Sequence, residues 1–381
     1  MSEREAVIVE AIRLPVGRRN GIYSETRPEY MLSAVLKGVV DRLGIHPSVV
    51  EDMIVGCVSQ AKEQGNNIAR IAGLMSGLSK EISARTINRK CGSSQQAVNL
   101  AAQAILAGDH DVIIAAGVEN MSRHPMGIDR VEAPEELNKL YEMIPQGVSA
   151  ERIAEKWNLT RKQLDEYSLR SHLLADKARK NGAFSREILP FTVIKDGEKI
   201  TVTKDEGIRP ESTIEKLGSL KTAFSENGVI TAGNSSQISD GAAAVTIMSK
   251  EKAIELGLKP RARIIARDVI GSDPTLMLTG IIPITERILK KAGLQVSDID
   301  VFEVNEAFAS VVMAWQQEFN PDMDKVNPRG GAIALGHPTG ASGARLMTSL
   351  LHELEDMDKR FGLQVMCCAG GMATATIIER L

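Results

Sequence analysis

A cysteine and a histidine, each beside small residues ahead of a helical segment, are the residues of this sequence best suited to chemistry. Cys91 is followed by Gly-Ser-Ser and then by a strongly helical run over 95–106. A helix N-terminus carries about half a positive charge, which favours a thiolate and lowers the pKa of a thiol placed there. Cys91 therefore fits an activated nucleophile with an anion-binding backbone beside it. A buried structural cysteine fits this stretch equally well.

His337 lies between Gly336 and Pro338, in a glycine-rich turn that we expect to lead from a strand into a helix. A cysteine and a histidine brought together form an activated pair, because the imidazole accepts the thiol proton. The alternative is a loop histidine that caps a backbone group. The other histidines lie in turns or polar helices and look structural: His46, His110, His124, His172 and His352.

Two further polar groups follow predicted buried strands. Asn305 comes after 300–304, and the ends of buried strands are where α/β proteins place site residues, although a helix N-cap explains Asn305 equally well. Cys367 and Cys368 end a strand predicted over 363–366. A thiol there either exchanges protons with a substrate or belongs to the core.

Apolar segments that alternate with helical ones surround these residues. The expected strands are 6–11, 52–58, 112–116 and 241–248, and the expected helices are 28–43, 68–75 and a long one to Lys180 that opens with a capping box at Thr160. Such alternation is typical of α/β proteins with sheets covered on both faces. The charged, loop-rich segment 119–237 interrupts it and is expected to lie over the core as an insertion.

The first part of the chain is echoed in the last part. Residues 42–54 and 291–303 both pass from a helix ending in glycine, through a turn with serine, into an acidic-flanked buried strand, at an offset of 293 − 44 = 249. The same offset carries Cys91 into the glycine-rich segment 335–343, which contains His337. Two similar α/β halves would bring these two turns to a shared site.

The composition indicates an ordinary globular protein. Of 381 residues, 43% are hydrophobic and 25% charged, and the net charge of −3 leaves no footprint for general nucleic-acid binding. The four cysteines lack zinc-site spacing and favour a reducing compartment, and no apolar run approaches the ~18 residues of a membrane helix. We expect a cytoplasmic protein with neither a metal nor a membrane anchor.

Taken together, the motifs resemble those of the thiolase family, the acetyl-CoA acetyltransferases and 3-ketoacyl-CoA thiolases. The resemblance covers nearly the whole chain, with motifs in the family's order at 13–17, 88–94, 119–122, 232–234, 240–243, 305–308 and 330–343. It implies a five-layer αβαβα fold of two similar, interlocked α/β halves with a loop domain over the site. We place the halves at 1–259, which includes the insertion, and 260–381.

The resemblance also implies roles. Cys91 takes the acyl group, and His337 activates it and, with a water held by Asn305, binds the thioester oxygen. A second oxyanion hole uses the backbone N–H groups of Cys91 and of a residue just after the C-terminal cysteine; such donors are worth roughly 3–4 kcal/mol each. That C-terminal cysteine moves the proton to and from the acetyl enolate or the CoA thiol.

Family members carry Cys-x-Gly at this acid/base position, and the chain offers two registers. Ungapped matching from His337 places Cys367 there (367 − 337 = 30) and puts Ala369 where glycine is usual. A register that starts at Cys368 keeps the motif but needs a one-residue shift. We predict Cys367, provided that the backbone of Ala369 does not require glycine.

Coenzyme A enters as a substrate, and no tightly bound cofactor is expected. The family pattern points to Arg209 as an adenine or phosphate contact, which in another context would be a solvated loop charge, and to Ser236 as a pantetheine contact. Ala232, Met277 and Phe308 complete the predicted CoA-binding set.

Two segments depart from the family pattern. Ile-Pro-Gln-Gly at 144–147 stands where members commonly have Met-Gly after His or Met, and because this loop borders the acyl pocket, the preferred chain length stays open. Segment 122–145 is shorter than in tetrameric members. A homodimer is therefore expected, with a homotetramer as the alternative.

These features predict an acetyl-CoA C-acyltransferase of fatty-acid metabolism, including β-oxidation. It would cleave 3-ketoacyl-CoA with CoA into acetyl-CoA and a shortened acyl-CoA, or run the reverse Claisen condensation, through an acyl-cysteine. A decarboxylating ketoacyl synthase of the same fold is one alternative, but that class uses a second His or Asn where this chain has a thiol. A non-catalytic module that binds acyl-CoA or lipid is the other, and such modules commonly lack a catalytic residue.

Overall fold

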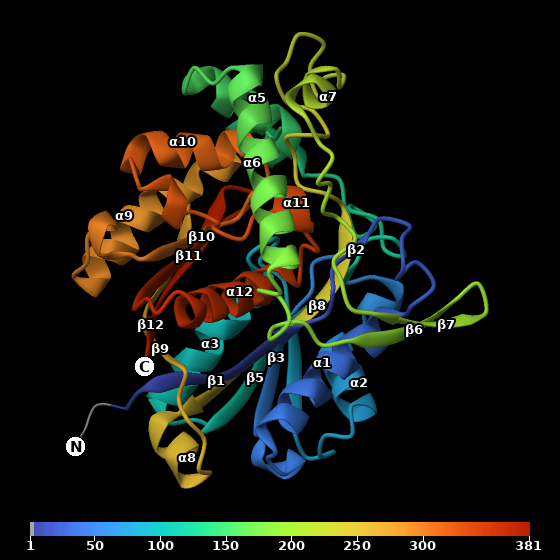
Figure 1. The fold of residues 1–381 in the computed structure, drawn as a ribbon, viewed down its shortest axis with the longest axis vertical. Coiled ribbons are helices and arrows are strands. Elements are labelled where there is room, and N and C mark those ends of the chain that lie inside the picture. Colours follow the sequence, from blue (N-terminus) through green and yellow to red (C-terminus); the bar gives the residue numbers. More distant parts are fainter. Residues whose placement is uncertain (1–3) are drawn as a thin grey trace.

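One large mixed sheet runs through the computed structural model, which describes residues 4–381 (Figure 1). The strand order is β10-β11-β12-β9-β1-β8-β5-β3-β4, and β2 pairs with β8. The strands are β1 (Ala6–Arg13), β2 (Gly17–Arg18), β3 (Asp52–Gly56), β4 (Ser83–Ile87), β5 (Val112–Asn120), β8 (Ser239–Ser249), β9 (Ala262–Gly271), β10 (Val301–Val304), β11 (Phe361–Cys368) and β12 (Met372–Arg380). The first part of the chain supplies β1 to β5 and β8 to this sheet, and the last part supplies β9 to β12.

Helices form three layers around the two halves of this sheet. The helices α1 (Pro28–Leu43) and α2 (Ile68–Met75) cover the outer face of the first half. The helices α9 (Ile281–Ala292) and α10 (Ala309–Phe319) cover that of the last half. Between them lie α3 (Ser93–Ala107) and α12 (Ser342–Asp356), whose apolar faces pack on strands of both halves. The predicted five-layer αβαβα arrangement is confirmed.

The predicted internal repeat is also present, with the same offset of 249. Corresponding elements begin or end at residues 249 apart: Gly44 after α1 and Gly293 after α9, both left-handed caps; the short 3-10 helices Pro47–Val49 and Val296–Asp298; Ser93 of α3 and Ser342 of α12; Val112 of β5 and Phe361 of β11. Both α3 and α12 are 15 residues long. The two catalytic candidates therefore belong to equivalent turns.

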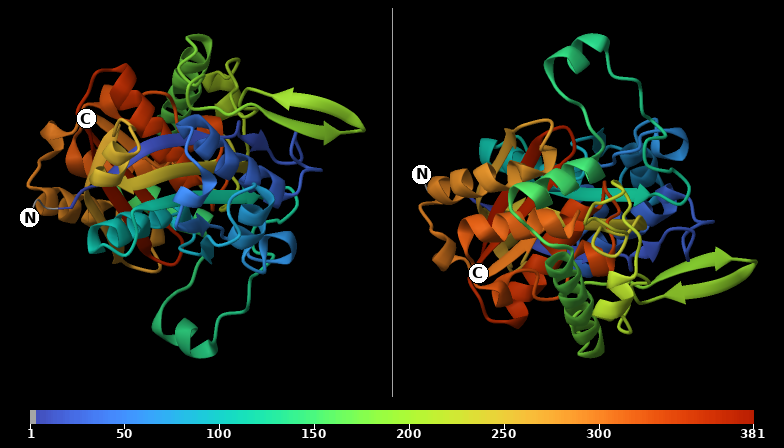
Figure 2. Two further views of the ribbon diagram at one scale, coloured as in Figure 1. Left: turned by 90° about the horizontal axis from the view of Figure 1, so that it is seen from below. Right: turned by 90° about the horizontal axis from the view of Figure 1, so that it is seen from above.

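Segment 121–238 lies outside the large sheet, over one end of the molecule. It contains α4 (Glu135–Leu140), α5 (Gln146–Lys156), α6 (Arg161–Lys180), the hairpin β6–β7 (Phe191–Lys195 and Glu198–Val202) and α7 (Ile214–Gly218). The capping box predicted at Thr160 is present and pairs it with Gln163. Figure 2 shows the arm that carries α4 standing away from the body. Its exposed apolar residues are flanked by charged ones and include Val131 (85% exposed) and Leu140 (73% exposed). Within residues 4–381, no helix is long and apolar enough to cross a membrane.

Candidate active site

The N-terminal turns of α3 and α12 meet in the middle layer of the fold. The Ser94 hydroxyl oxygen accepts a hydrogen bond from the Ala344 N–H at 2.9 Å. A methyl group on Gly343 would lie 2.1 Å from the Gln95 nitrogen, so only glycine allows this approach. Serine and glycine at these positions thus bring the Cys91 turn of one half against the His337 turn of the other.

The chain enters His337 from a helix, not from a strand as predicted. The short helix α11 (Ala332–Leu335) precedes it, and the Leu335 N–H bonds to the Gly331 carbonyl at 2.8 Å. A run of four apolar residues does not distinguish helix from strand, which explains the error. Gly336 then turns the chain with φ 104°, a conformation that favours glycine.

Hydrogen bonds fix the His337 ring as a neutral base. Its Nδ1 lies 2.6 Å from the Ser342 hydroxyl, which donates to the Pro338 carbonyl at 2.9 Å and so accepts from the imidazole. The proton is therefore on Nδ1, and Nε2 is free to accept one. Burial, together with the charge of Arg345, lowers the pKa of His337 to about 3. A histidine capping the backbone does not describe this ring.

Asn305 directly follows β10 and faces this base. Its Nδ2 lies 3.5 Å from His337 Nε2. The helix α10 begins only at Ala309, with Phe308 at its N-cap, so Asn305 is not a helix cap. Its Oδ1 is buried without a hydrogen-bond partner among residues 4–381. That oxygen is available to a water or a substrate group.

Cys91 is 7% exposed and packs against Leu346 and Met366. Burial raises the pKa of its thiol to about 11, while hydrogen bonds from the backbone N–H groups of Ala369 and of Cys91 itself oppose the rise. The predicted lowering is therefore wrong. Cys91 precedes the first residue of α3 by two positions, so removal from water outweighs the helix terminus. The resting thiol keeps its proton and needs a base.

The two C-terminal cysteines end β11 and contact different groups. Burial raises the pKa of the Cys367 thiol, a charge on Cys91 raises it further, and the Asn305 side chain opposes the rise. Cys368 faces Gly92 instead, since a methyl group there would lie 2.7 Å from its sulfur. Burial also raises the pKa of Cys368, and a charge on Cys91 raises it further, as it does for Cys367.

The backbone conformation of Ala369 does not require glycine, which is the condition for placing the acid/base at Cys367. The left-handed conformations of this turn fall on Gly370 and Gly371, with φ 82° and 75°, and Ala369 is not among the residues with positive φ. Its N–H group points to the Cys91 sulfur. An alanine can therefore present the same backbone donor that a glycine would.

Most of the predicted CoA contacts adjoin these turns. The Ser236 N–H bonds to the Ala307 carbonyl at 2.9 Å, and the Gln237 carbonyl accepts the His337 N–H at 3.1 Å. The Gln237 side chain in turn bonds to the Gly207 carbonyl at 2.9 Å, two residues before the exposed Arg209. The segments of Ser236 and Arg209 are thus tied to the His337 turn.

An aromatic pair lies beside this region. The Phe308 ring meets Phe224 edge-on with centroids 6.0 Å apart, and a methyl group on Gly147 would lie 2.2 Å from the Phe224 ring. Met277 is buried in the same apolar cluster as Phe308, whereas Ala232 is exposed. The unusual segment 144–147 therefore borders the same aromatic wall.

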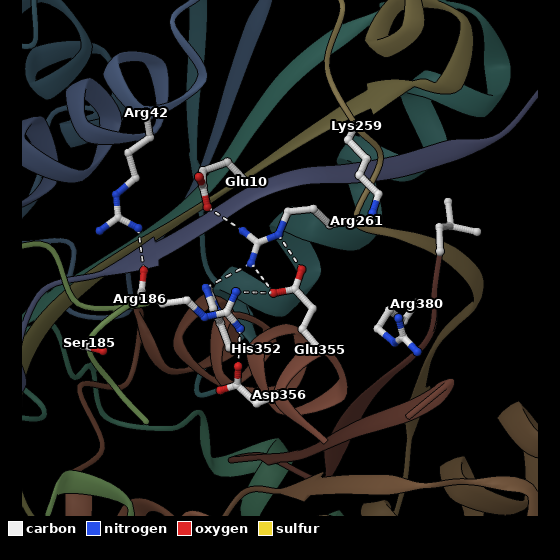
Figure 3. Close-up of a pocket in the computed structure, with 11 residues that line it drawn as sticks. Glu10, Arg42, Ser185, Arg186, Lys259, Arg261, His352, Glu355, Asp356 and Arg380 are labelled. Carbon is white, nitrogen blue, oxygen red and sulfur yellow. Dashed lines mark hydrogen bonds and ion pairs between the residues drawn. The ribbon is translucent and has the colours of Figure 1, made fainter. Parts of the chain in front are cut away.

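A cavity of about 730 Å³ elsewhere on the surface is not the reaction site (Figure 3). Two of its arginines are held in ion pairs: Arg261 with Glu10 at 2.6 Å and with Glu355 at 2.7 Å, and Arg186 with Glu355 at 2.9 Å. It contains none of the cysteines and is lined by residues of β1, α1, α12 and β12 and of the segment before β9. Among the described residues, no group of three or more His, Cys, Asp or Glu is placed to hold a metal ion.

Sequence reasoning missed the residues that hold the site in place. Ser342 was not assigned to His337, although it lies five residues on in the same turn. Glu306 is fully buried and accepts hydrogen bonds from Tyr167 at 2.9 Å, Ser171 at 2.8 Å and the Ile333 N–H at 3.0 Å. A carboxylate next to Asn305 within an otherwise apolar stretch was the available signal.

The fold and the clustered cysteines, histidine and asparagine define an acyl-transferring enzyme of the αβαβα class. The family description "Thiolase, N-terminal domain" matches residues 6–251, and "Thiolase, C-terminal domain" matches 258–380. The chain therefore belongs to the thiolase family and is an acyltransferase.

Individual relatives agree with this assignment over their whole length. The chain is 44% identical to a 3-ketoacyl-CoA thiolase of Idiomarina loihiensis (99% of this chain, 100% of the relative). It is 45% identical to the steroid 3-ketoacyl-CoA thiolase FadA6 of Mycobacterium tuberculosis (99% and 94%). The crystal structure of the Bacillus anthracis acetyl-CoA acetyltransferase superposes with a TM-score of 0.93 at 37% identity (100% and 99%).

Proposed function

We propose that this protein is a 3-ketoacyl-CoA thiolase that works through an acyl group on Cys91. The observation that supports this most is the convergence of four groups from three turns, those of Cys91, of His337 and of Cys367 with Ala369. Asn305 Nδ2 lies 3.5 Å from His337 Nε2. The Asn305 side chain opposes the rise in the pKa of Cys367, and the Ala369 N–H opposes that of Cys91. A nucleophile, a neutral base, a second thiol and a backbone donor are what acyl transfer between thioesters requires.

In the first half-reaction, His337 Nε2 takes the proton of Cys91, and the sulfur attacks the C3 carbonyl of the 3-ketoacyl-CoA. The N–H groups of Cys91 and Ala369 stabilise the oxyanion at C3. The C2–C3 bond then breaks, and the acetyl-CoA enolate, with its oxygen at protonated His337 and a water on Asn305, takes a proton from Cys367. Acetyl-CoA leaves, and the shortened acyl group stays on Cys91.

In the second half-reaction, coenzyme A returns the protons. The Cys367 thiolate takes the proton of the CoA thiol, and the CoA sulfur attacks the acyl-cysteine. As the tetrahedral intermediate collapses, the Cys91 sulfur leaves and recovers its proton from His337. The cycle is balanced in atoms and charge and needs no tightly bound cofactor.

CoA would lie along the segments of Arg209 and Ser236, with Phe308 toward the pantetheine and Met277 and Ala232 nearby. The aromatic wall formed by Phe224 and Phe308 would border the acyl chain. Initial thiolysis rates over a panel from acetoacetyl-CoA to long-chain and steroid-derived ketoacyl-CoA measure which sizes of acyl group this wall accommodates. Rates that do not vary with chain length would contradict a shaping role for this wall.

We further propose that the protein is a cytoplasmic homodimer. Within each chain, the boundary between the two halves would lie between residues 259 and 260. The strand β4 supports this assembly, because it ends the sheet and is half-exposed, with one edge not paired in the described chain. A homotetramer is the alternative, and the arm of α4, which stands away from the body, is available for that contact. Light scattering at micromolar concentration distinguishes two subunits from four.

Intact-mass spectrometry after addition of acetyl-CoA tests the nucleophile. We expect one acetyl group per chain in the unsubstituted protein and none in Cys91→Ala. Cys57→Ala is the matched control, because Cys57 is a buried thiol of the outer core, and it should acetylate normally. If Cys91→Ala still gains an acetyl group at another cysteine, the assignment is wrong.

A further inference from the structure

One buried carboxylate joins the two halves directly behind the reactive turns. Glu119 lies at the end of β5, is 0% exposed and accepts hydrogen bonds from both halves of the chain. The donors are the Val58 N–H (2.9 Å), the Ser59 N–H (3.1 Å), Gln64 Nε2 (2.7 Å), Thr339 Oγ1 (3.1 Å) and the Gly340 N–H (2.9 Å). Three of these belong to the loop after β3, and two belong to the turn that starts at His337.

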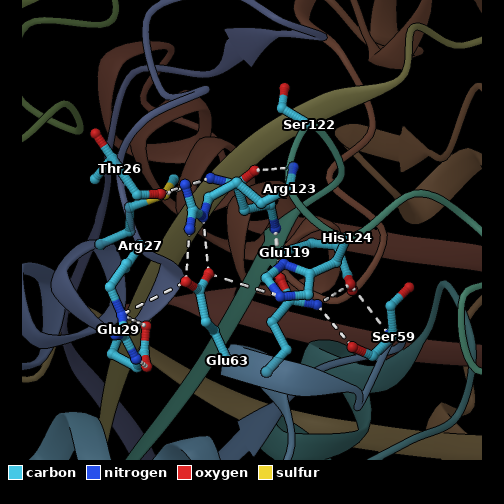
Figure 4. A network of polar contacts seen from close by, with 12 residues as sticks. Thr26, Arg27, Glu29, Ser59, Glu63, Glu119, Ser122, Arg123 and His124 are labelled. Atoms are coloured by element: carbon cyan, nitrogen blue, oxygen red, sulfur yellow. Dashed lines mark hydrogen bonds and ion pairs between the residues drawn. The ribbon is translucent and has the colours of Figure 1, made fainter. Parts of the chain in front are cut away.

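The surroundings leave this carboxylate little freedom. Gln64 holds it on one side, since the Gln64 amide also donates to the Ser59 carbonyl and accepts the Asn120 N–H. On the other side, a methyl group on Gly340 would lie 2.7 Å from Glu119 Oε2. Figure 4 shows Glu119 among Ser59, Glu63 and His124. The Glu119 side chain therefore adds a link between the His337 turn and the first half to the contacts of Ser94 and Gly343.

A carboxylate suits this place better than an amide does. Five donors converge on two oxygens, which together offer about four lone-pair sites and carry no hydrogen. A glutamine would turn an NH₂ group toward at least one backbone N–H and leave that N–H unpaired. Hydrogen bonds to a charged acceptor are also about twice as strong as neutral ones. The choice of Glu at 119 thus strengthens the link between the halves.

We propose that Glu119 is a positioning residue for acyl transfer. Its carboxylate holds the His337 turn against the half that carries Cys91, so that His337 Nε2 stays within proton-transfer distance of the Cys91 sulfur. This inference rests on the proposed roles of Cys91 and His337. It assigns Glu119 no contact with substrate.

Steady-state thiolysis by Glu119→Gln tests the inference. Because a misplacement of about 1 Å at a reacting pair costs up to ~100-fold, we expect kcat to fall by about 10- to 100-fold. KM for the ketoacyl-CoA should change by less than about twofold, since Glu119 hydrogen-bonds to none of the candidate CoA contacts. Glu119→Asp keeps the charge with a shorter reach and should recover part of the lost kcat.

A second readout separates positioning from a purely structural role. The charge of Glu119 helps to raise the pKa of the Cys91 thiol. Alkylation of Cys91 by iodoacetamide should therefore reach its half-maximal rate at a lower pH in Glu119→Gln than in the unsubstituted protein, although turnover is slower. A protein whose structure is merely loosened would lose the rate of Cys91 alkylation and the rate of turnover together.

Glu187→Gln is the matched control, because Glu187 is an equally buried carboxylate paired with Arg13 at 2.7 Å, away from the cysteines. It should lower Tm and leave kcat within about twofold. The inference is overturned if folded Glu119→Gln keeps kcat within twofold, if its loss lies in KM, or if Glu187→Gln loses kcat equally.

A third variant covers the case in which Glu119→Gln does not fold. Thr339→Val removes one hydrogen bond to the same carboxylate and should lower kcat about threefold; an unchanged kcat would then reject the inference. The unsubstituted protein is acetylated in parallel. If it gains no acetyl group on Cys91, the proposed function fails. If it is acetylated normally and the Glu119 variants leave kcat unchanged, only the inference about Glu119 fails.

Discussion

The Cys91 turn and the His337 turn occupy equivalent places in the two halves, yet they use the same serine differently. Ser93 and Ser342 both begin a 15-residue helix. The Ser93 hydroxyl accepts the Arg89 N–H at 2.9 Å and donates to the Lys90 carbonyl at 2.6 Å, so it serves its own backbone. The Ser342 hydroxyl gives its acceptor side to the His337 imidazole. The repeat therefore gives both turns the same backbone arrangement, and the partner of each serine hydroxyl differs: the backbone for Ser93 and the His337 imidazole for Ser342.

Burial acts on the two reactive groups in opposite directions with one result. It raises the pKa of Cys91 to about 11 and lowers that of His337 to about 3. Both groups are therefore neutral at rest, because a dry interior disfavours either charge. The proton moves only when a substrate oxyanion forms beside them. The comparison thus predicts that the Cys91 thiol stays protonated and weakly nucleophilic when no substrate is bound.

The largest effect should separate the two neighbouring thiols. We expect Cys367→Ala to lower thiolysis about 10²- to 10³-fold, because it removes a general acid and base, whereas Cys368→Ala should stay within about threefold. Exchange of the acetyl-CoA methyl protons in D₂O measures enolate formation directly. The reverse order of the two variants would move the acid/base role to Cys368.

A smaller effect should distinguish the paired serines. Ser342→Ala leaves the His337 Nδ1–H unpaired and frees the ring, so we expect kcat to fall about tenfold. Ser93→Ala loses only backbone hydrogen bonds and should cost about 0.5–1.5 kcal/mol of stability for each, with kcat within about threefold. Kinetics and urea unfolding of both variants check this. Equal losses of kcat would show that the two turns do not differ as described.

The smallest effect concerns stability against pH. The pKa of His337 is about 3 in the folded protein against an ordinary 6.5, so the unfolded chain binds more protons between these values. Its contribution to stability is fully present above pH 6.5 and is lost as pH falls toward 3. Urea unfolding at pH 7.5 and 5.0 should show a smaller decrease for His337→Gln than for the unsubstituted protein. An equal decrease would contradict a buried neutral ring.

The helices and strands were largely predictable because apolar periodicity and the residues at helix ends are visible in the sequence. The helices 28–43 and 68–75 have the predicted bounds, since Pro and Gly at the ends of the first and apolar periodicity in both determine them. The offset of 249 was visible because a glycine cap and a serine turn repeat with the fold. The family followed from several motifs in order.

What failed depended on three-dimensional surroundings. The pKa of Cys91 was predicted in the wrong direction, because a helix terminus is visible in sequence whereas complete burial of the sulfur is not. The helix before His337 was taken for a strand, because four apolar residues suit both. The link made by Glu119 joins residues more than 200 positions apart, and no local pattern announces it.

The position of β1 has a consequence for synthesis of the chain. This first strand lies in the interior of the sheet, between β8 and β9, so its partners begin only at Ser239 and Ala262. At about 5–20 residues per second, the ribosome needs roughly 10–45 s to reach them after β1 has emerged. Throughout that interval the apolar strand has both edges open. A nascent chain of this protein is therefore a natural client for chaperones that shield unpaired strands.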